Sequence, residues 1–211
     1  MAVKIIENYL TLEDCSRYIE YFDSKSFVGA QANMRNALGY PNSMVASKIN
    51  SETGVFPEEK DKINFELGAV YGRIKEEMAK HAGVPVDLCQ SSYQVMLEGA
   101  LNELHADSVK LDGTPIQADG TPDEIEFSGL LYLNDYGKDF EGGEVEWPAF
   151  NLLYKPKAGD LVLFFGDVEH RHEVKKVLSG ERKNVVFFWS REGNVSEGNF
   201  FSVEYDQPEV W

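Results

Sequence analysis

Two cysteines, few basic residues and no long apolar run limit what this 211-residue chain can be. Cys15 and Cys89 are far apart and form no C-x-x-C pair, so we expect two buried free thiols instead of a zinc site or a disulfide framework. Apolar runs such as DLVLFF are far shorter than the roughly 20 residues that a membrane-spanning helix needs. The opening MAVKIIENYL lacks a signal-peptide pattern. We therefore expect a soluble, intracellular and cytoplasmic protein.

Basic residues are scarce: 20 Lys and Arg stand against 36 Asp and Glu, and the formal net charge is −16. Proteins that bind a nucleic-acid backbone or an anionic membrane surface need clustered Lys and Arg, so the composition disfavours both kinds of partner. The acids are unevenly spread, with nine between Asp119 and Glu146, where Lys138 is the one base. A solvated surface is the ordinary explanation for such a cluster.

The first 84 residues predict a short strand at VKIIENYL and two helices. Thr11 and Asp14 form a capping-box pattern, which predicts a helix through about Asp23. Pro57 and Gly83 suit the start and the end of a second helix. Its apolar residues recur at the spacing of one buried helix face. They are Ile63, Leu67, Tyr71, Ile74 and Met78.

From residue 85 onward the sequence changes to short β-branched and aromatic runs, separated by Gly, Pro, Asn and Asp. About eight such strands predict a sandwich or barrel of the jelly-roll kind, because doubling or closing a sheet hides its edges. We expect a mainly β (α+β) chain with the two helices packed on one outer face. As domains, we expect one unit over 1–211, with helical support at 1–84 and a β-rich core at 85–205.

His105 and Asp107 form a His-x-Asp pair. On a strand, residues two apart project from the same face, so this imidazole and carboxylate would point together into the mouth of the fold. A third ligand from a distant strand would give two histidines and one carboxylate on one face of an iron ion, with open positions beside them. His81, His170 and His172 are the remaining histidines. The pair itself does not choose among them, although His81 is most simply a surface or capping residue.

Arg182 lies ten residues after His172, beyond a turn at Gly180. An arginine in this place would offer a planar fork of donors to a carboxylate deeper in the fold. The plain alternative is a solvated charge at the end of a hairpin, as we expect for Lys183.

These features resemble the iron(II)- and 2-oxoglutarate-dependent dioxygenases, most closely their prolyl 4-hydroxylase-like branch. The resemblance covers about residues 85 to 190. It rests on the order and spacing of His105-x-Asp107, 130-LLYLND-135, 140-FEGGEVEW-147, 156-PKAGDLVLFF-165 and 172-HEVKKVLSGER-182. In that family the distal histidine begins an H-x-V-x-x-V-x-x-G-x-R pattern. The pattern fits from His172 and loses every match from His170.

The resemblance implies a double-stranded β-helix (jelly-roll, cupin-like) core in which His105, Asp107 and His172 bind Fe(II) at the catalytic centre. It implies that Arg182 binds the distal carboxylate of 2-oxoglutarate. Tyr132 either assists through its hydroxyl or is only a core aromatic. The implied reaction uses O2 to hydroxylate an unactivated C–H bond, releasing succinate and CO2, with ascorbate as a reductant. A prolyl residue of a peptide or protein is the implied substrate.

Neighbouring positions complete the pattern. Gly142 and Gly143 predict a turn or bulge in which side chains do not fit. Phe188 has the strand parity of Arg182, so we expect it to line the same pocket, while Trp189 faces away.

Three features bear on access to the site. The irregular stretches 27–56 and 108–125 flank it and would be lids by position alone. Acids between Asp119 and Glu146 would favour a basic peptide substrate if they line the mouth. Relatives carry a tyrosine about nine residues before the first ligand, where this chain has Met96. Contacts with cosubstrate or substrate are therefore expected to differ there.

Two other classes of protein stay open. One is a cupin-like metalloenzyme that uses His170 and His172 with His105 and does not need 2-oxoglutarate; the spacing of Arg182 argues against it. The other is a non-catalytic β-sandwich binding module in which the histidines are polar surface residues. If His172 is the ligand, His170 is its same-face neighbour, as a supporting or surface group.

Overall fold

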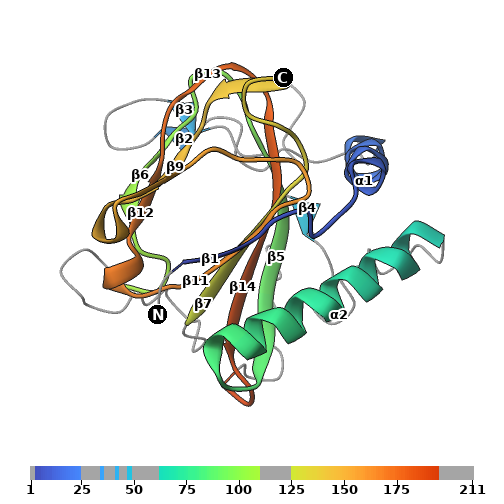
Figure 1. Cartoon of the computed structure of the whole chain (residues 1–211), viewed down its shortest axis with the longest axis vertical. Coiled ribbons are helices and arrows are strands. Elements are labelled where there is room, and N and C mark those ends of the chain that lie inside the picture. Colours follow the sequence, from blue (N-terminus) through green and yellow to red (C-terminus); the bar gives the residue numbers. More distant parts are fainter. Residues whose placement is uncertain are drawn as a thin grey trace, which may run out of the picture.

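The computed structural model describes residues 3–24, 34–35, 41–42, 47–48, 62–109 and 125–194. Two helices lie beside a pair of facing β-sheets (Figure 1). The expected helix start at Pro57, most of both expected lids and the strand expected at FFSVEY fall outside the described residues.

The large sheet has six strands and the facing small sheet has four. In order, the large sheet contains β1 (Lys4–Ile6), β11 (Leu161–Phe165), β7 (Phe127–Tyr132), β14 (Arg182–Arg191), β5 (Val86–Met96) and β4 (Ser47–Lys48). The small sheet contains β10 (Leu152–Tyr154), β9 (Val145–Trp147), β12 (His172–Val174) and β6 (Asn102–His105). Two short pairs are β13 (Val177–Gly180) with β8 (Phe140–Gly142), and β2 (Met34–Arg35) with β3 (Pro41–Asn42).

The helices are α1 (Leu12–Ser24) and α2 (Lys62–Ala82), with single 3-10 turns η1 (Pro148–Phe150) and η2 (Val168–His170). The predicted helix start at Thr11 is confirmed, because the Asp14 backbone N–H donates to Thr11 Oγ1 at 3.1 Å. The second helix ends as predicted at Gly83, whose φ of 74° suits glycine and whose N–H donates to the Ala79 carbonyl. Among the described residues, neither helix is long and apolar enough to cross a bilayer.

Both helices cover the same outer face of the large sheet (Figure 1). Phe22 of α1 is buried and stacks on Tyr93 of β5, with ring centroids 4.7 Å apart. Ile74 and Met78 of α2 are fully buried in the same cluster. Burying such side chains contributes about 1.5 to 3 kcal/mol each, so helix packing anchors the sheet. The predicted placement of two helices on one outer face is confirmed.

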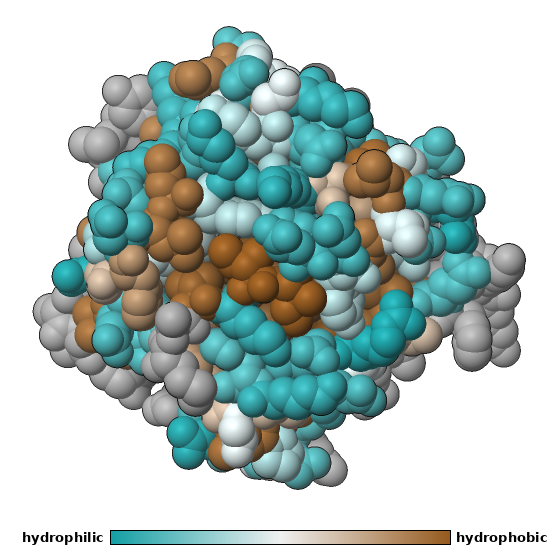
Figure 2. All heavy atoms as spheres, in the orientation of Figure 1, coloured by the Kyte–Doolittle hydropathy of each residue, from teal (hydrophilic) through white to brown (hydrophobic). Residues whose placement is uncertain are grey.

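A second apolar cluster fills the space between the two sheets. It joins β7, β11 and β14 of the large sheet to β9, β10 and β12 of the small sheet. Figure 2 shows apolar surface near the centre of this view, over β1, where half-buried Val3 and Ile5 pack against the cluster. The predicted jelly-roll core is confirmed, as two facing sheets and not a closed barrel.

The glycine pair at 142–143 forms a turn, as predicted. Gly142 has a φ of 73°, and a Cβ atom there would lie 2.1 Å from the Lys176 carbonyl oxygen. Cys15 and Cys89 are not joined by a disulfide; Cys15 is buried as expected, whereas Cys89 is only half-buried.

The expected surface or capping role of His81 is wrong. Its side chain is buried at the end of α2 against Phe165 of β11, with ring centroids 5.4 Å apart. Its Nε2 has no hydrogen-bond partner within the described part of the chain. Burial lowers the pKa of His81 to about 4, and the positive charge of Lys4 acts in the same direction.

This buried histidine predicts a loss of stability in mild acid. The unfolded chain binds a proton on His81 near its ordinary pKa of about 6.5, while the folded chain resists it, so stability is lost as the pH falls from about 6.5 towards 4. We expect His81→Gln to reduce the drop in unfolding free energy between pH 7 and pH 5 by about 1 to 2 kcal/mol. Urea denaturation at the two pH values measures it. An equal drop in both proteins would contradict the prediction.

Candidate metal centre

Pairing of β6 with β12 places His105 opposite His172. Their ring centroids are 4.4 Å apart. Asp107 follows β6 by two residues, and its Oδ1 lies 3.4 Å from His105 Nε2. One donor atom from each of these three side chains lies within 4.8 Å of the others. The structure therefore brings together the three residues that the sequence singled out as metal ligands.

Backbone carbonyls orient both imidazole rings. His105 Nδ1 lies 2.6 Å from the Glu103 carbonyl oxygen, and His172 Nδ1 lies 3.2 Å from that of His170. A ring nitrogen that donates to a carbonyl carries the hydrogen, so the other nitrogen keeps its lone pair for a metal. Trp147 stacks on the His172 ring at 5.7 Å and further fixes it. Both rings thus offer Nε2.

The protonation states suit a cation. Burial lowers the pKa of His172 to about 4, so the ring is neutral at neutral pH. Burial raises the pKa of Asp107, but the His105 hydrogen bond, the proximity of both imidazoles and the Ser128 hydroxyl outweigh it, and the pKa is lowered. For His105, burial lowers the pKa, but Asp107 and the Glu103 carbonyl raise it overall. A bound cation would replace the proton that His105 shares with Asp107.

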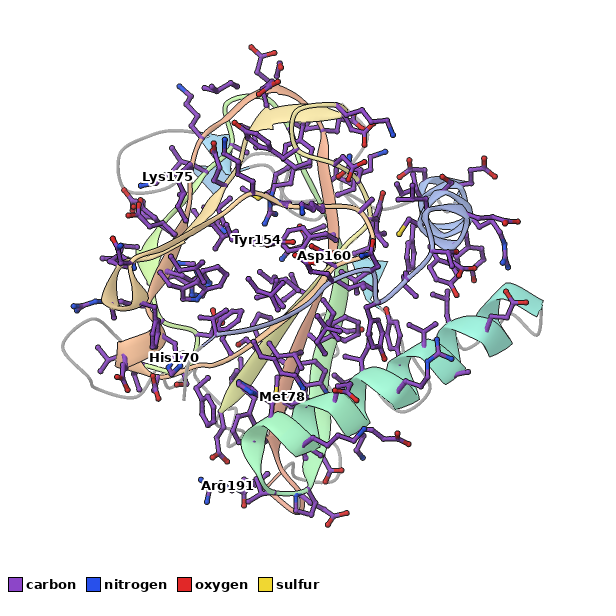
Figure 3. The ribbon with its side chains drawn as sticks, in the orientation of Figure 1. Met78, Tyr154, Asp160, His170, Lys175 and Arg191 are labelled. Carbon is purple, nitrogen blue, oxygen red and sulfur yellow. The ribbon has the colours of Figure 1, made fainter. Side chains whose placement is uncertain are left out.

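His170 does not belong to this group. It ends η2 and is buried, so its expected alternative as a surface residue is wrong (Figure 3). Its Nδ1 lies 2.7 Å from Asp167 Oδ1, and its ring packs between Phe150 and Phe165. The metal-ligand group found among the described residues contains His172 and leaves out His170, contrary to the cupin-like alternative.

Arg182 is buried, with 1% of its surface exposed, so a solvated charge at a hairpin end is excluded. Its Nε donates to the Gly143 carbonyl at 3.1 Å and its Nη2 to Tyr132 Oη at 3.2 Å. Nη1 donates to Asn184 Oδ1 at 2.6 Å and contacts Met96 Sδ at 3.3 Å. Every one of these partners is neutral. Within the described residues, no carboxylate pairs with this buried cation.

Counting donors shows what the guanidinium still offers. Arginine has five N–H groups, and four of them have the partners named above. One Nη2 hydrogen remains, and so does the hydroxyl hydrogen of Tyr132, because Tyr132 Oη accepts from Arg182. An uncompensated buried cation is costly, so the two adjacent donors favour an anionic group beside them. Tyr132 is therefore both a buried core aromatic and a contact of Arg182.

Tyr132 packs on a tyrosine whose hydroxyl is hydrogen-bonded to a buried carboxylate. Its ring packs on Tyr154 of β10, with centroids 5.5 Å apart. The Tyr154 hydroxyl donates to Asp160 Oδ2 at 2.7 Å, and both residues lie near the middle of Figure 3. Asp160 also accepts from the backbone N–H of Asn8, which ties the segment after β1 to the site.

A cavity of about 50 Å³ connects the histidine pair to Arg182. Phe188 lines it as predicted, and Trp189 faces away into the helix-side cluster. The full lining is Gln94, Asn102, His105, Asp107, Ser128, Leu130, Phe164, His172, Val174, Arg182, Val186 and Phe188. None of the described acids from Glu126 to Glu146 is among them. Those acids therefore do not support attraction of a basic substrate.

Sequence reasoning missed three parts of this site: Asn184, Ser128 and the packing of Trp147 on His172. Asn184 lies two residues after Arg182 on β14, so strand parity alone places it on the same face. The Trp147 contact joins β9 to β12, and no local pattern predicts it.

The 2OG-Fe(II) oxygenase superfamily model matches residues 91–191. The predicted cofactors, Fe(II) and 2-oxoglutarate, are the two that this description names. The chain is 34% identical to prolyl 3-hydroxylase 2 of Rattus norvegicus over 95 residues, which is 41% of this chain and 13% of that protein. The chain thus spans a small part of the length of such relatives.

Solved structures share the fold. The viral collagen prolyl hydroxylase vCPH from Paramecium Bursaria Chlorella virus-1, in a 2-oxoglutarate complex, has a TM-score of 0.64 at 16% identity, over 90% of this chain and 95% of that one. A Pseudomonas putida prolyl-4-hydroxylase has a TM-score of 0.63 at 16% identity, and the match covers 90% of this chain and 93% of that one. A Trichoplax adhaerens prolyl hydroxylase, in complex with a hypoxia inducible factor oxygen degradation domain peptide fragment, has a TM-score of 0.60 at 17% identity. The match covers 91% of this chain and 84% of that one.

The ordered motifs, the jelly roll and these matches agree with one another. Residues 91–191 therefore match the 2OG-Fe(II) oxygenase superfamily, and the chain is similar to prolyl hydroxylases in sequence and in fold.

Proposed function

We propose that this chain is an Fe(II)- and 2-oxoglutarate-dependent dioxygenase that hydroxylates a prolyl residue of a peptide or protein. One observation carries the proposal. A two-histidine, one-carboxylate cluster shares a cavity with a buried arginine that has no counter-charge among the described residues. A metal site and an anion site at the two ends of one cavity suit a cosubstrate that has a metal-chelating end and a carboxylate end.

In this proposal, His105 Nε2, a carboxylate oxygen of Asp107 and His172 Nε2 hold the iron. When bound, iron and 2-oxoglutarate supply the oxidation, in which one oxygen atom of O2 enters the substrate C–H bond and the other enters succinate as CO2 leaves. Arg182 Nη2 and Tyr132 Oη donate to the distal carboxylate. Leu130 and Val186 are apolar and line the cavity. They exclude water beside the cosubstrate.

The prolyl substrate rests on the relatives. The sequence match is to a prolyl 3-hydroxylase, and the structural neighbours are prolyl hydroxylases, one of them with a peptide fragment. The matched parts of the curated relatives are short, so the experiments below test the cofactors and the substrate separately.

Removing one proposed ligand should abolish the iron centre. Anaerobic wild-type protein given Fe(II) and 2-oxoglutarate should develop the weak visible absorption band of a metal-bound 2-oxo acid, and His172→Ala should not. His81→Gln is the matched control, since it alters a buried histidine outside the cavity. A band that survives in His172→Ala would exclude His172 as a ligand. Absence of a band in the wild type would favour a binding module.

Arg182→Gln should raise the KM for 2-oxoglutarate about 10- to 100-fold, as expected for losing a hydrogen bond to a charged group. Turnover at saturating cosubstrate should change less. Lys183→Gln provides the control, because Lys183 is the next residue and pairs instead with Asp23 and Glu181 outside the cavity. Equal KM values in wild type and Arg182→Gln would remove Arg182 from the cosubstrate site.

A peptide with a single proline should gain the mass of one oxygen atom while succinate is released in equal amount. The same peptide with alanine at that position should gain none. Fragmentation mass spectrometry locates the oxygen, and nuclear magnetic resonance distinguishes hydroxylation at C3 from C4. If the alanine peptide gained oxygen as readily as the proline peptide, with succinate released in equal amount, the prolyl substrate would be refuted. The assignment of the cofactors would stand.

A further inference from the structure

Ser128 is an unexplained polar group in the cavity. It lies on β7, with 1% of its surface exposed, and its side chain lines the same cavity as the metal-ligand cluster. Its Oγ has no hydrogen-bond partner within the described residues. A buried hydroxyl normally has a hydrogen-bond partner. An unpaired hydroxyl that faces a cavity therefore points to a partner that moves within reach when a ligand binds in the cavity.

The nearest acidic group to this hydroxyl in the cavity lining is Asp107, the one acid among those residues. Ser128 and Asp107 line the same cavity of about 50 Å³, so the hydroxyl and the carboxylate share one small space. The Asp107 carboxylate lies 3.4 Å from His105 Nε2. A metal would take both His105 Nε2 and one carboxylate oxygen, which leaves the second oxygen in need of a donor.

Strand alternation supports the same partner. Ser128, Leu130 and Tyr132 are spaced by two along β7, so they face the inter-sheet side together. Tyr132 stands at the Arg182 end, and Ser128 is four residues away, about 13 Å along the strand. Ser128 is therefore the hydroxyl that β7 supplies at the metal end of the cavity. Carboxylates that bind metals are commonly held by a second group of this kind.

We propose that Ser128 is a positioning residue whose hydroxyl donates to the Asp107 oxygen that does not bind the metal. The inference rests on the proposed iron site. It adds a residue that holds the carboxylate ligand in its binding orientation and so strengthens metal binding.

The test measures Fe(II) affinity anaerobically by calorimetry, first without cosubstrate. We expect Ser128→Ala to weaken Fe(II) binding about 10- to 100-fold, the usual effect of removing such a supporting group. Ser128→Thr retains the hydroxyl and should stay within about threefold of wild type. The dissociation constant of 2-oxoglutarate at saturating iron should be the same in Ser128→Ala and wild type.

Ser91→Ala is the matched control. Ser91 is also a buried serine whose hydroxyl has no partner among the residues that the structure describes, but it lies on β5 beside Tyr71, in the helix-side core. We expect its Fe(II) affinity to equal that of wild type. An equal loss in Ser91→Ala and Ser128→Ala would show a general packing effect and overturn the proposal.

Three other outcomes would also overturn it. Wild-type Fe(II) affinity in Ser128→Ala, with a normal 2-oxoglutarate band, would remove Ser128 from the site but leave the proposed function standing. If Ser128→Ala weakened only the binding of 2-oxoglutarate, the hydroxyl would be assigned to a contact with the cosubstrate instead of Asp107. If the wild-type chain bound no Fe(II), both the proposed function and the proposed role of Ser128 would be refuted.

Discussion

The alternation of side chains along β7 and β14 is the constraint on which the site depends. Each strand is covered on one face by the helices and on the other by the small sheet, so successive residues enter two different environments. On β14, Val185 and Phe187 face the helices, whereas Arg182 and Val186 face the cavity. A shift of one residue in register would exchange the two sets. Burial of large apolar side chains on both faces makes that shift costly.

The buried guanidinium is the second constraint, because its charge is removed from water without an ionic partner among the described residues. A carbonyl, an amide, a hydroxyl and a thioether occupy four of its donors and hold it in one orientation. Neutral partners fix its position while its charge stays uncompensated. Position 143 is also restricted to glycine, since a Cβ atom on Gly143 would lie 2.9 Å from Arg182 Cδ. The glycine turn and the arginine are therefore parts of one arrangement.

The metal-ligand cluster depends on the other sheet. Asp107 follows β6, and His105 and His172 come from neighbouring strands that are 67 residues apart in sequence but paired in space. Their ring orientations come from backbone carbonyls, which side-chain substitution elsewhere does not remove. Facing sheets thus supply different chemistry: the small sheet brings together the cluster that suits a cation, and the large sheet carries the arginine that suits an anion. The inner apolar packing sets the distance between them.

Local patterns in the sequence determined much of this protein. The capping box at Thr11, the apolar spacing of α2, the strand-rich second half and the glycine turn all follow from short-range sterics and side-chain periodicity. The spacing from His172 to Arg182, read with the family resemblance, also singled out the residues that the structure places around one cavity.

Burial was decided only by tertiary structure. His81 and His170 resemble surface residues in the sequence, but both pack on Phe165, and the contact of His81 joins segments that are distant in the chain. The neutral cage of Arg182 and the unpaired hydroxyl of Ser128 likewise arise only when separate strands and turns meet, because desolvation and hydrogen bonding depend on neighbours in space and not on neighbours in sequence.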